Sequence, residues 1–134
     1  MGIIFDLDYT IIDSSIAKDE RRARNWKNVY ELIPKMQPFR KVVDFINWAV
    51  QNGIEVAIVT SSPRSYCERV LNFLGIDSVI TVCYHDTQNH KPDSEPLLLA
   101  IKKMKNQEGK MIVAIGDQEK DVIAANNIHN VVSI

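Results

Sequence analysis

The sequence begins with MGIIFDLDYT, residues 1–10, in which an apolar run leads into two aspartates, Asp6 and Asp8. The run from Ile3 to Phe5 is continuous rather than alternating, which predicts a short strand covered on both faces. Two carboxylates two positions apart at the end of such a strand lie close together, and their charges repel unless positive charge separates them. No lysine or arginine is near them in the sequence, so the pair indicates a divalent cation.

Alternating strands and helices organise the rest of the chain. Five apolar runs predict strands, at residues 3–5, 54–59, 79–82, 111–115 and 131–134. Helical patterns occupy residues 38–52, 62–75, 93–105 and 118–127, with Ser62 and Pro63 as the expected N-cap and first residue of the second helix and Gly75 as its expected end. This order predicts an α/β fold, a Rossmann-like three-layer sandwich with a five-stranded parallel sheet and right-handed crossovers.

One segment, residues 14–35, interrupts this alternation. It is charged at first and then places Trp26, Val29, Tyr30 and Ile33 at helical spacing. The pattern predicts one helix packed on the sheet. The segment is too short to be a domain, so we expect residues 1–134 to form a single domain with a short helical insert.

Composition excludes several classes of function. The chain has 134 residues, 46% of them hydrophobic and 25% charged, with a net charge of −1, so charge does not point to nucleic acid or to a membrane surface. No run approaches the roughly 18 apolar residues of a membrane helix, and the N-terminus has no signal-peptide pattern. We therefore expect a cytoplasmic protein. Cys67 and Cys83 lack metal-type spacing and are predicted to be reduced thiols.

Polar side chains follow four of the predicted strands, at the edge where ligands bind in open parallel sheets. They are Asp6 and Asp8 after the first strand, Thr60 and Ser61 after the second, Lys91 beyond the third, and Asp117 and Asp121 after the fourth. Singly, most have ordinary interpretations as helix caps, strand ends or solvated loop residues. Together they suit phosphoryl chemistry. Carboxylates hold Mg²⁺ beside a substrate phosphate, lysine neutralises phosphate charge, one aspartate attacks and another moves a proton.

Four segments, FDLDYT, IVTSSPRSY, HKPDSEP and GDQEKD, resemble motifs of the haloacid dehalogenase (HAD) superfamily, most closely the phosphoglycolate-phosphatase-like branch. The resemblance implies a phosphatase that acts through an aspartyl-phosphate. The implied roles are Asp6 as nucleophile and metal ligand, Asp8 as general acid/base with a backbone carbonyl on Mg²⁺, Thr60, Ser61 and Lys91 as phosphoryl-binding residues, Asp117 as a metal ligand, and Asp121 as a ligand or a partner of one.

The chain departs from that family at two informative places. Tyr9 stands where glycine is usual, and the helical cap of this branch is reduced to about residues 14–35. Because caps select substrates and exclude water, an open site would suit a large phosphorylated substrate, a covering subunit, or small phosphates held loosely. The insert also carries a basic cluster, interpreted either as a solvated helix face or as a rim that attracts phosphate: Lys18, Arg21, Arg22, Arg24 and Lys27. Arg64 is a weaker candidate of the same kind.

Other functions stay open at this stage. A phosphotransferase or mutase would use the same intermediate, and a HAD-like binding module would use the same fold without turnover. A signalling receiver domain also gathers acids and a lysine on a parallel sheet, but its lysine follows the phosphorylated aspartate, whereas Lys91 precedes Asp117. His85, His90 and His129 lack metal-site spacing.

Overall fold

A five-stranded parallel sheet forms the centre of the molecule. The computed structural model describes residues 1–105 and 111–134. The strands lie in the order β5-β4-β1-β6-β7, all parallel. Their bounds are β1 (Gly2–Phe5), β4 (Glu55–Val59), β5 (Ile80–Val82), β6 (Ile112–Ile115) and β7 (Val131–Ser133). The predicted parallel sheet is therefore confirmed, with strand ends shifted by no more than one residue.

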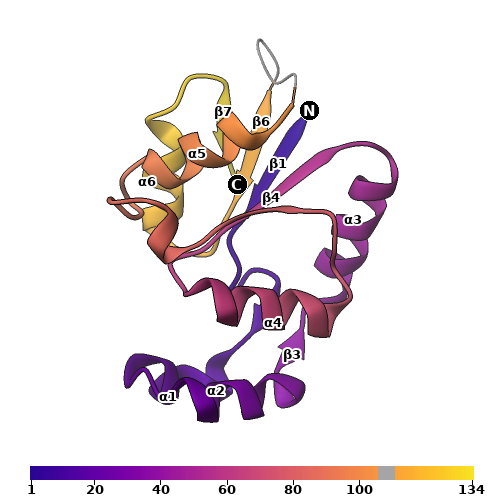
Figure 1. Ribbon diagram of the computed structural model, residues 1–134. Helices are drawn as coiled ribbons and strands as arrows, with labels where there is room; N and C mark the ends of the chain where they lie inside the picture. Colours follow the sequence, from indigo (N-terminus) through magenta and orange to yellow (C-terminus); the bar gives the residue numbers. More distant parts are fainter. Residues whose placement is uncertain (106–110) are drawn as a thin grey trace.

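Helices cover both faces of this sheet, as Figure 1 shows, with α3 on one side and α5 and α6 on the other. The helix bounds are α3 (Arg40–Gln51), α4 (Arg64–Leu74), α5 (Glu95–Lys103) and α6 (Glu119–Asn126), and a 3₁₀ turn, η3 (Tyr84–Asp86), follows β5. Successive side chains of β1 point to opposite faces. Ile3 and Phe5 join one buried cluster and Ile4 joins the other.

The insert differs from its prediction. In place of one helix it contains η1 (Ser15–Ala17), α1 (Lys18–Arg22), α2 (Trp26–Leu32) and η2 (Ile33–Lys35). The helical path breaks at Arg24, whose φ of 58° lies in the left-handed region. Two short antiparallel strands, β2 (Ile12–Asp13) and β3 (Gln37–Pro38), join the ends of the insert.

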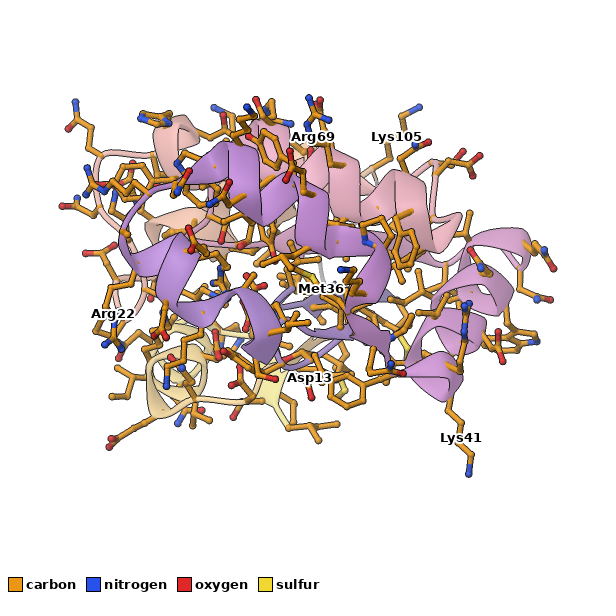
Figure 2. All side chains as sticks on the ribbon, turned by 90° about the horizontal axis from the view of Figure 1, so that it is seen from below. Asp13, Arg22, Met36, Lys41, Arg69 and Lys105 are labelled. Atoms are coloured by element: carbon orange, nitrogen blue, oxygen red, sulfur yellow. The ribbon has the colours of Figure 1, made fainter. Side chains whose placement is uncertain are left out.

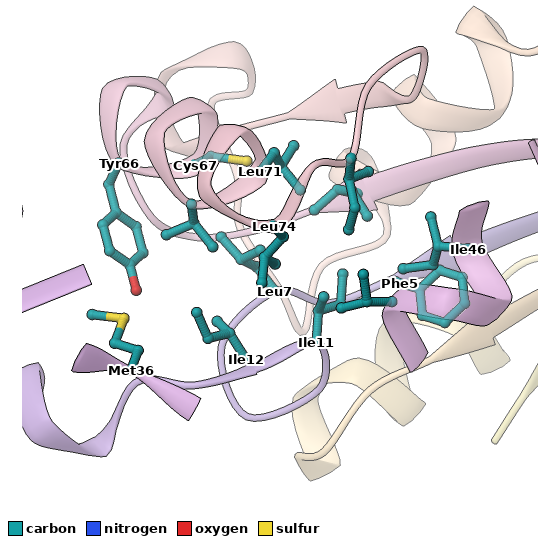
Figure 3. Packing of buried hydrophobic residues seen from close by; sticks show 14 of the residues in the cluster. Phe5, Leu7, Ile11, Ile12, Met36, Ile46, Tyr66, Cys67, Leu71 and Leu74 are labelled. Atoms are coloured by element: carbon teal, nitrogen blue, oxygen red, sulfur yellow. The ribbon is translucent and has the colours of Figure 1, made fainter. Parts of the chain in front are cut away.

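The insert packs on α4, not on the sheet as predicted. Figure 1 shows α1 and α2 on the far side of α4 from the five-stranded sheet. Val29 is fully buried, and the ring of Trp26 lies 5.7 Å from the ring of Tyr66 on α4. Met36, the residue after the insert, points toward Tyr66 in the close view of the core (Figure 3). The helix α4 therefore has apolar contacts on two sides.

The loop after β1 is fixed by the same helix. Leu7, Ile11 and Ile12 are fully buried, and Figure 3 shows them beneath Leu71 and Leu74 of α4. The aspartates carried by this loop are thus held by apolar side chains placed between and after them.

Two predicted helix ends have different outcomes. Gly75 ends α4 in the left-handed conformation, with φ of 71°, as predicted. The predicted N-cap is wrong by one residue, because Pro63 occupies that position and α4 begins at Arg64. Ser62 instead uses its hydroxyl within the candidate site. Cys67 and Cys83 are free thiols, as predicted, and both are buried. Within residues 1–105 and 111–134, no helix has the length and apolar character needed to cross a membrane.

Candidate active site

The carboxyl ends of the central strands bring the predicted residues together. Asp6 directly follows β1, and its backbone N–H donates to the carbonyl of Ile115 at 2.9 Å, which ties it to β6. Thr60 follows β4, and its N–H donates to Val82 of β5 at 2.9 Å. Asp117 comes two residues after β6. One edge of the sheet therefore carries residues that are far apart in the sequence.

Lys91 connects two of the acids. Its Nζ donates to Asp6 Oδ1 at 2.9 Å, to Asp121 Oδ1 at 2.6 Å and to the carbonyl of Val59 at 3.1 Å. The lysine side chain is only 3% exposed. Because a buried ammonium is costly unless paired, these contacts fix its position between the two carboxylates. The sequence analysis did not predict the contact of Lys91 with Asp121.

Three carboxylates form a group that fits a divalent cation. Oxygens of Asp6, Asp117 and Asp121 all lie within 4.8 Å of one another. Their three negative charges and the one positive charge of Lys91 sum to −2, which a divalent cation would neutralise. Hard oxygen ligands of this kind are those that Mg²⁺ prefers. The side chain of Asp8 is not part of this group among the described residues, and its predicted backbone ligand stays a prediction.

Burial and charge shift the titration of this group. Burial, with a further contribution from the nearby charge of Asp121, raises the pKa of Asp6 from 3.8 to about 7, against the opposing field of Lys91. For Lys91, burial lowers the pKa, but the charges of Asp6 and Asp121 outweigh it, so that the net shift is upward. The lysine therefore stays charged, while the proton on Asp6 is exchangeable near neutral pH.

Asp121 is positioned by the start of α6. Its Oδ2 accepts a hydrogen bond from the N–H of Gln118 at 3.1 Å, as the third residue of a capping box. The approach is possible because residue 116 is glycine: a Cβ there would lie 2.4 Å from Cβ and Cγ of Asp121. Asp121 thus both caps α6 and pairs with Lys91. The sequence analysis did not identify Gly116 as a residue that this arrangement requires.

Asp8 has a separate set of partners. Its Oδ1 accepts hydrogen bonds from Ser14 Oγ at 2.7 Å and from the hydroxyl of Tyr66 at 2.6 Å. Its Oδ2 accepts one from Ser62 Oγ at 3.2 Å and lies 3.0 Å from Nη2 of Arg21. The loop, the insert and α4 all contribute to this cluster. Sequence analysis predicted none of these partners for Asp8.

The turn after β4 is also ordered by side-chain contacts. Thr60 is buried, and its Oγ1 accepts a hydrogen bond from the N–H of Ser62 at 3.1 Å. Ser61, a second predicted phosphate-binding residue, lies in the same turn. Arg64 is directed elsewhere, because its guanidinium pairs with Asp86 and donates to Thr81 Oγ1 at 2.7 Å.

A cleft of about 550 Å³ opens beside Asp8, between the insert and the strand ends. Tyr9 lines it with a φ of 64°, a left-handed conformation that costs a tyrosine about 1–2 kcal/mol and a glycine almost nothing. Four of the five residues of the insert's basic cluster also line the cleft, and Lys27 does not. The full lining is Tyr9, Lys18, Arg21, Arg22, Arg24, Trp26, Ser61, Ser62, Pro63, Tyr84 and His85.

Comparison with known proteins identifies the family. The family model described as "Haloacid dehalogenase-like hydrolase" matches residues 16–132. The chain belongs to this family. The matched region begins after Asp6 and Asp8. The position of these two aspartates at the end of β1 is therefore known from the structure and not from the family match.

Several curated proteins are similar to part of this HAD-like chain. The Putative pyrophosphatase PpaX of Caldanaerobacter subterraneus subsp. tengcongensis is 30% identical over 79 residues, which are 58% of this chain and 36% of that protein. Phosphoglycolate phosphatase 1 of Pseudomonas aeruginosa is 31% identical over 86 residues, 63% of this chain and 31% of that protein. The aligned regions span about a third of these two relatives.

Solved structures have the same fold. CbbY from Rhodobacter sphaeroides, in complex with phosphate, superposes with a TM-score of 0.76 at 16% identity, covering 93% of this chain and 81% of that one. A HAD phosphatase from Thermococcus onnurineus gives 0.75 at 20% identity, covering 96% and 82%. At these identities the likeness shows the fold.

Proposed function

We propose that this HAD-family protein is a Mg²⁺-dependent phosphatase that hydrolyses a phosphomonoester through an aspartyl-phosphate on Asp6. The observation that carries the proposal is the buried Lys91, placed 2.9 Å from Asp6 and 2.6 Å from Asp121. A fixed positive charge beside a carboxylate nucleophile compensates the repulsion that an incoming phosphate would meet. The names of the matched relatives, a pyrophosphatase and a phosphoglycolate phosphatase, also support a phosphorylated substrate.

In the proposed reaction, an oxygen of Asp6 attacks phosphorus, the bond to the leaving oxygen breaks, and that oxygen takes a proton from Asp8. Water then attacks the phosphorus of the acyl phosphate and gives its proton to Asp8, which releases inorganic phosphate and restores Asp6. Thr60, Ser61 and Lys91 bind the phosphoryl oxygens throughout.

The metal requirement follows from the same carboxylates. Asp6, Asp117 and Asp121, with the backbone carbonyl of Asp8, would hold Mg²⁺, which neutralises phosphate charge when bound. Three expectations from the sequence stay predictions: the cytoplasmic location, the single domain and a second subunit that covers the site.

Hydrolysis of p-nitrophenyl phosphate tests the proposal. We expect turnover with Mg²⁺ and none after chelation with EDTA, and a fall of about 10³-fold or more in Asp6→Asn. Asp44→Asn, at an exposed site on α3, makes the same change outside the site and should leave the rate unaltered. Equal rates for Asp6→Asn and the wild-type protein would contradict the proposal. Release of more alcohol than inorganic phosphate would indicate phosphoryl transfer in place of hydrolysis.

A further inference from the structure

The cleft beside Asp8 has an unbalanced charge. Four cationic side chains line it, Lys18, Arg21, Arg22 and Arg24, and no aspartate or glutamate does. Arg21 is neutralised by Asp8 at 3.0 Å. Within residues 1–105 and 111–134, the other three have no ion pair with a carboxylate. Asp19 and Glu20 lie on the same short helix, α1, but do not line the cleft. The charged side chains that face the cleft are therefore all cations.

The backbone at this cleft is also strained. Two residues of its lining, Tyr9 and Arg24, have φ of 64° and 58°. Neither residue is glycine, and each such conformation costs on the order of 1–2 kcal/mol. Strain held at a charged concave surface is typical of a binding site.

The position of the cleft relates it to the reaction. Ser62 and Arg21 line the cleft, and both contact the carboxylate of Asp8. If Asp8 protonates the leaving oxygen, as proposed above, the rest of the leaving group extends from Asp8 into this cleft. Trp26 and Tyr84 supply apolar surface there, which suits a carbon skeleton.

The size of the cleft limits what can occupy it. A volume of about 550 Å³ falls in the range of about 300–1,000 Å³ typical of sites for small organic molecules. A sugar or nucleoside skeleton of ordinary size fits such a site.

Resting on the phosphatase activity proposed above, we propose that the substrate is a small organic bisphosphate: one phosphate reacts at Asp6 and the second binds Lys18, Arg22 and Arg24 in the cleft. Three cations match a dianionic phosphate better than a single carboxylate, because each charged contact adds to the same anion. The basic cluster is thus a specificity site, which decides between the two interpretations that the sequence left open.

Binding of matched ligand pairs tests this directly. Calorimetric titration with Mg²⁺ would use the full chain carrying Asp6→Asn, so that no ligand is consumed. The pairs are fructose 6-phosphate with fructose 1,6-bisphosphate, and 5′-AMP with adenosine 3′,5′-bisphosphate. A third series grades the second charge on one skeleton: glycerol 3-phosphate, 3-phosphoglycerate and 2,3-bisphosphoglycerate. We expect at least one bisphosphate to bind about tenfold or more tightly than its monophosphate, with the difference shrinking as salt rises.

Charge-removal variants locate the second site. Lys18→Gln and Arg22→Gln should each reduce the preference for the bisphosphate by about fivefold or more. Lys41→Gln removes the same charge at the opposite end of the molecule from Arg22 (Figure 2) and should leave the preference unchanged. No preference in any pair, an equal preference for 3-phosphoglycerate, or equal effects of Lys18→Gln and Lys41→Gln would overturn the proposal.

Failure of this inference is distinguishable from failure of the proposed function. Turnover of p-nitrophenyl phosphate by the wild-type protein without any bisphosphate preference would reject the specificity site and keep the phosphatase. A bisphosphate preference in binding without turnover of any phosphate ester would reject the phosphatase and keep the anion site.

Discussion

Arg21 of the insert lies 3.0 Å from the carboxylate of Asp8, two residues beyond the proposed nucleophile. The same guanidinium donates to Ser14 Oγ at 2.9 Å and lies 5.5 Å from the ring centroid of Tyr66. Arg21 therefore connects the insert both to Asp8, the proposed general acid, and to Tyr66 of α4. This short segment both orders Asp8 and forms one wall of the cleft.

The first prediction concerns this attachment. Arg21→Gln leaves the buried Asp8 without its charged partner, so we expect the free energy of unfolding to fall by about 1–3 kcal/mol. Urea unfolding measures the change. Arg22→Gln makes the same substitution one residue later, at an exposed side chain, and should change stability little. Equal losses in the two variants would mean that the contact with Asp8 does not stabilise the fold.

The second prediction concerns Lys91. Lys91→Met keeps the unbranched stem but leaves Asp6 and Asp121 uncompensated, so the metal-free protein should lose about 3–5 kcal/mol of stability. The group then carries three negative charges, so Mg²⁺ should bind more tightly while turnover falls about 10²-fold or more. Calorimetry and a phosphatase assay measure these opposite effects, with Lys41→Met as control. Weaker Mg²⁺ binding in Lys91→Met would contradict the account.

The third prediction concerns pH. Because the folded pKa of Asp6 is raised from 3.8 to about 7, this group favours the folded state below about pH 4, and the contribution is lost as pH rises through 7. The folding stability lost between these pH values is up to about 4 kcal/mol. A cation bound to the ionised Asp6 would restore that stability. The increase in melting temperature on adding Mg²⁺ should therefore be larger at pH 8 than at pH 5.

Asp6→Asn removes the titrating group and should abolish most of that pH dependence, whereas Asp44→Asn should keep it. A Mg²⁺-induced shift of the same size at both pH values in the wild-type protein would count against the raised pKa.

The fourth prediction concerns Gly116. In Gly116→Ala the new Cβ would overlap Asp121, which has to move away from Lys91. We expect Mg²⁺ affinity and turnover to fall together, with a loss of stability. Gly53→Ala provides a matched control, since its φ of 75° is strained for alanine while no atom lies within 4 Å of the added Cβ. That variant should lose about 1 kcal/mol of stability and keep its Mg²⁺ affinity; an equal loss of affinity in both would refute the packing argument.

The strands and the acidic residues were predictable because they depend on local sequence. A strand buried on both faces needs a continuous apolar run, so residues such as Ile3 and Ile58 marked β1 and β4 directly. In a parallel sheet the carboxyl ends of strands meet at one edge. Asp6, Thr60 and Asp117 could therefore be grouped before any contact between them was known.

The insert was harder to predict, since its form depends on weak local signals. Arg24 adopts φ of 58° without being glycine or asparagine, so the break between α1 and α2 carries no sequence signature. The strands β2 and β3 contain two residues each, too few to show alternation. Ile12 of β2 is fully buried beneath α4, a tertiary contact that strand propensity does not reveal.

The partners of Asp8 come from three separate segments, and only tertiary structure brings them together. One signal was available: Tyr66 lies on the apolar face of α4, and a buried tyrosine hydroxyl usually finds a hydrogen-bond partner. Serine is a common N-cap residue, so Ser62 was interpreted as a cap. Its contact with Asp8 was therefore not predicted.

Phosphorylation of Asp6 is the central claim, and trapping of the intermediate tests it most directly. The full chain would be mixed with p-nitrophenyl phosphate and Mg²⁺, quenched in acid during turnover, and treated with borohydride, which reduces an acyl phosphate to an alcohol. Peptide mass spectrometry then identifies the residue. The account predicts reduction at Asp6 alone, dependent on both substrate and Mg²⁺. Continued turnover with Asp6 unmodified, or reduction at Asp8, Asp117 or Asp121, would contradict it.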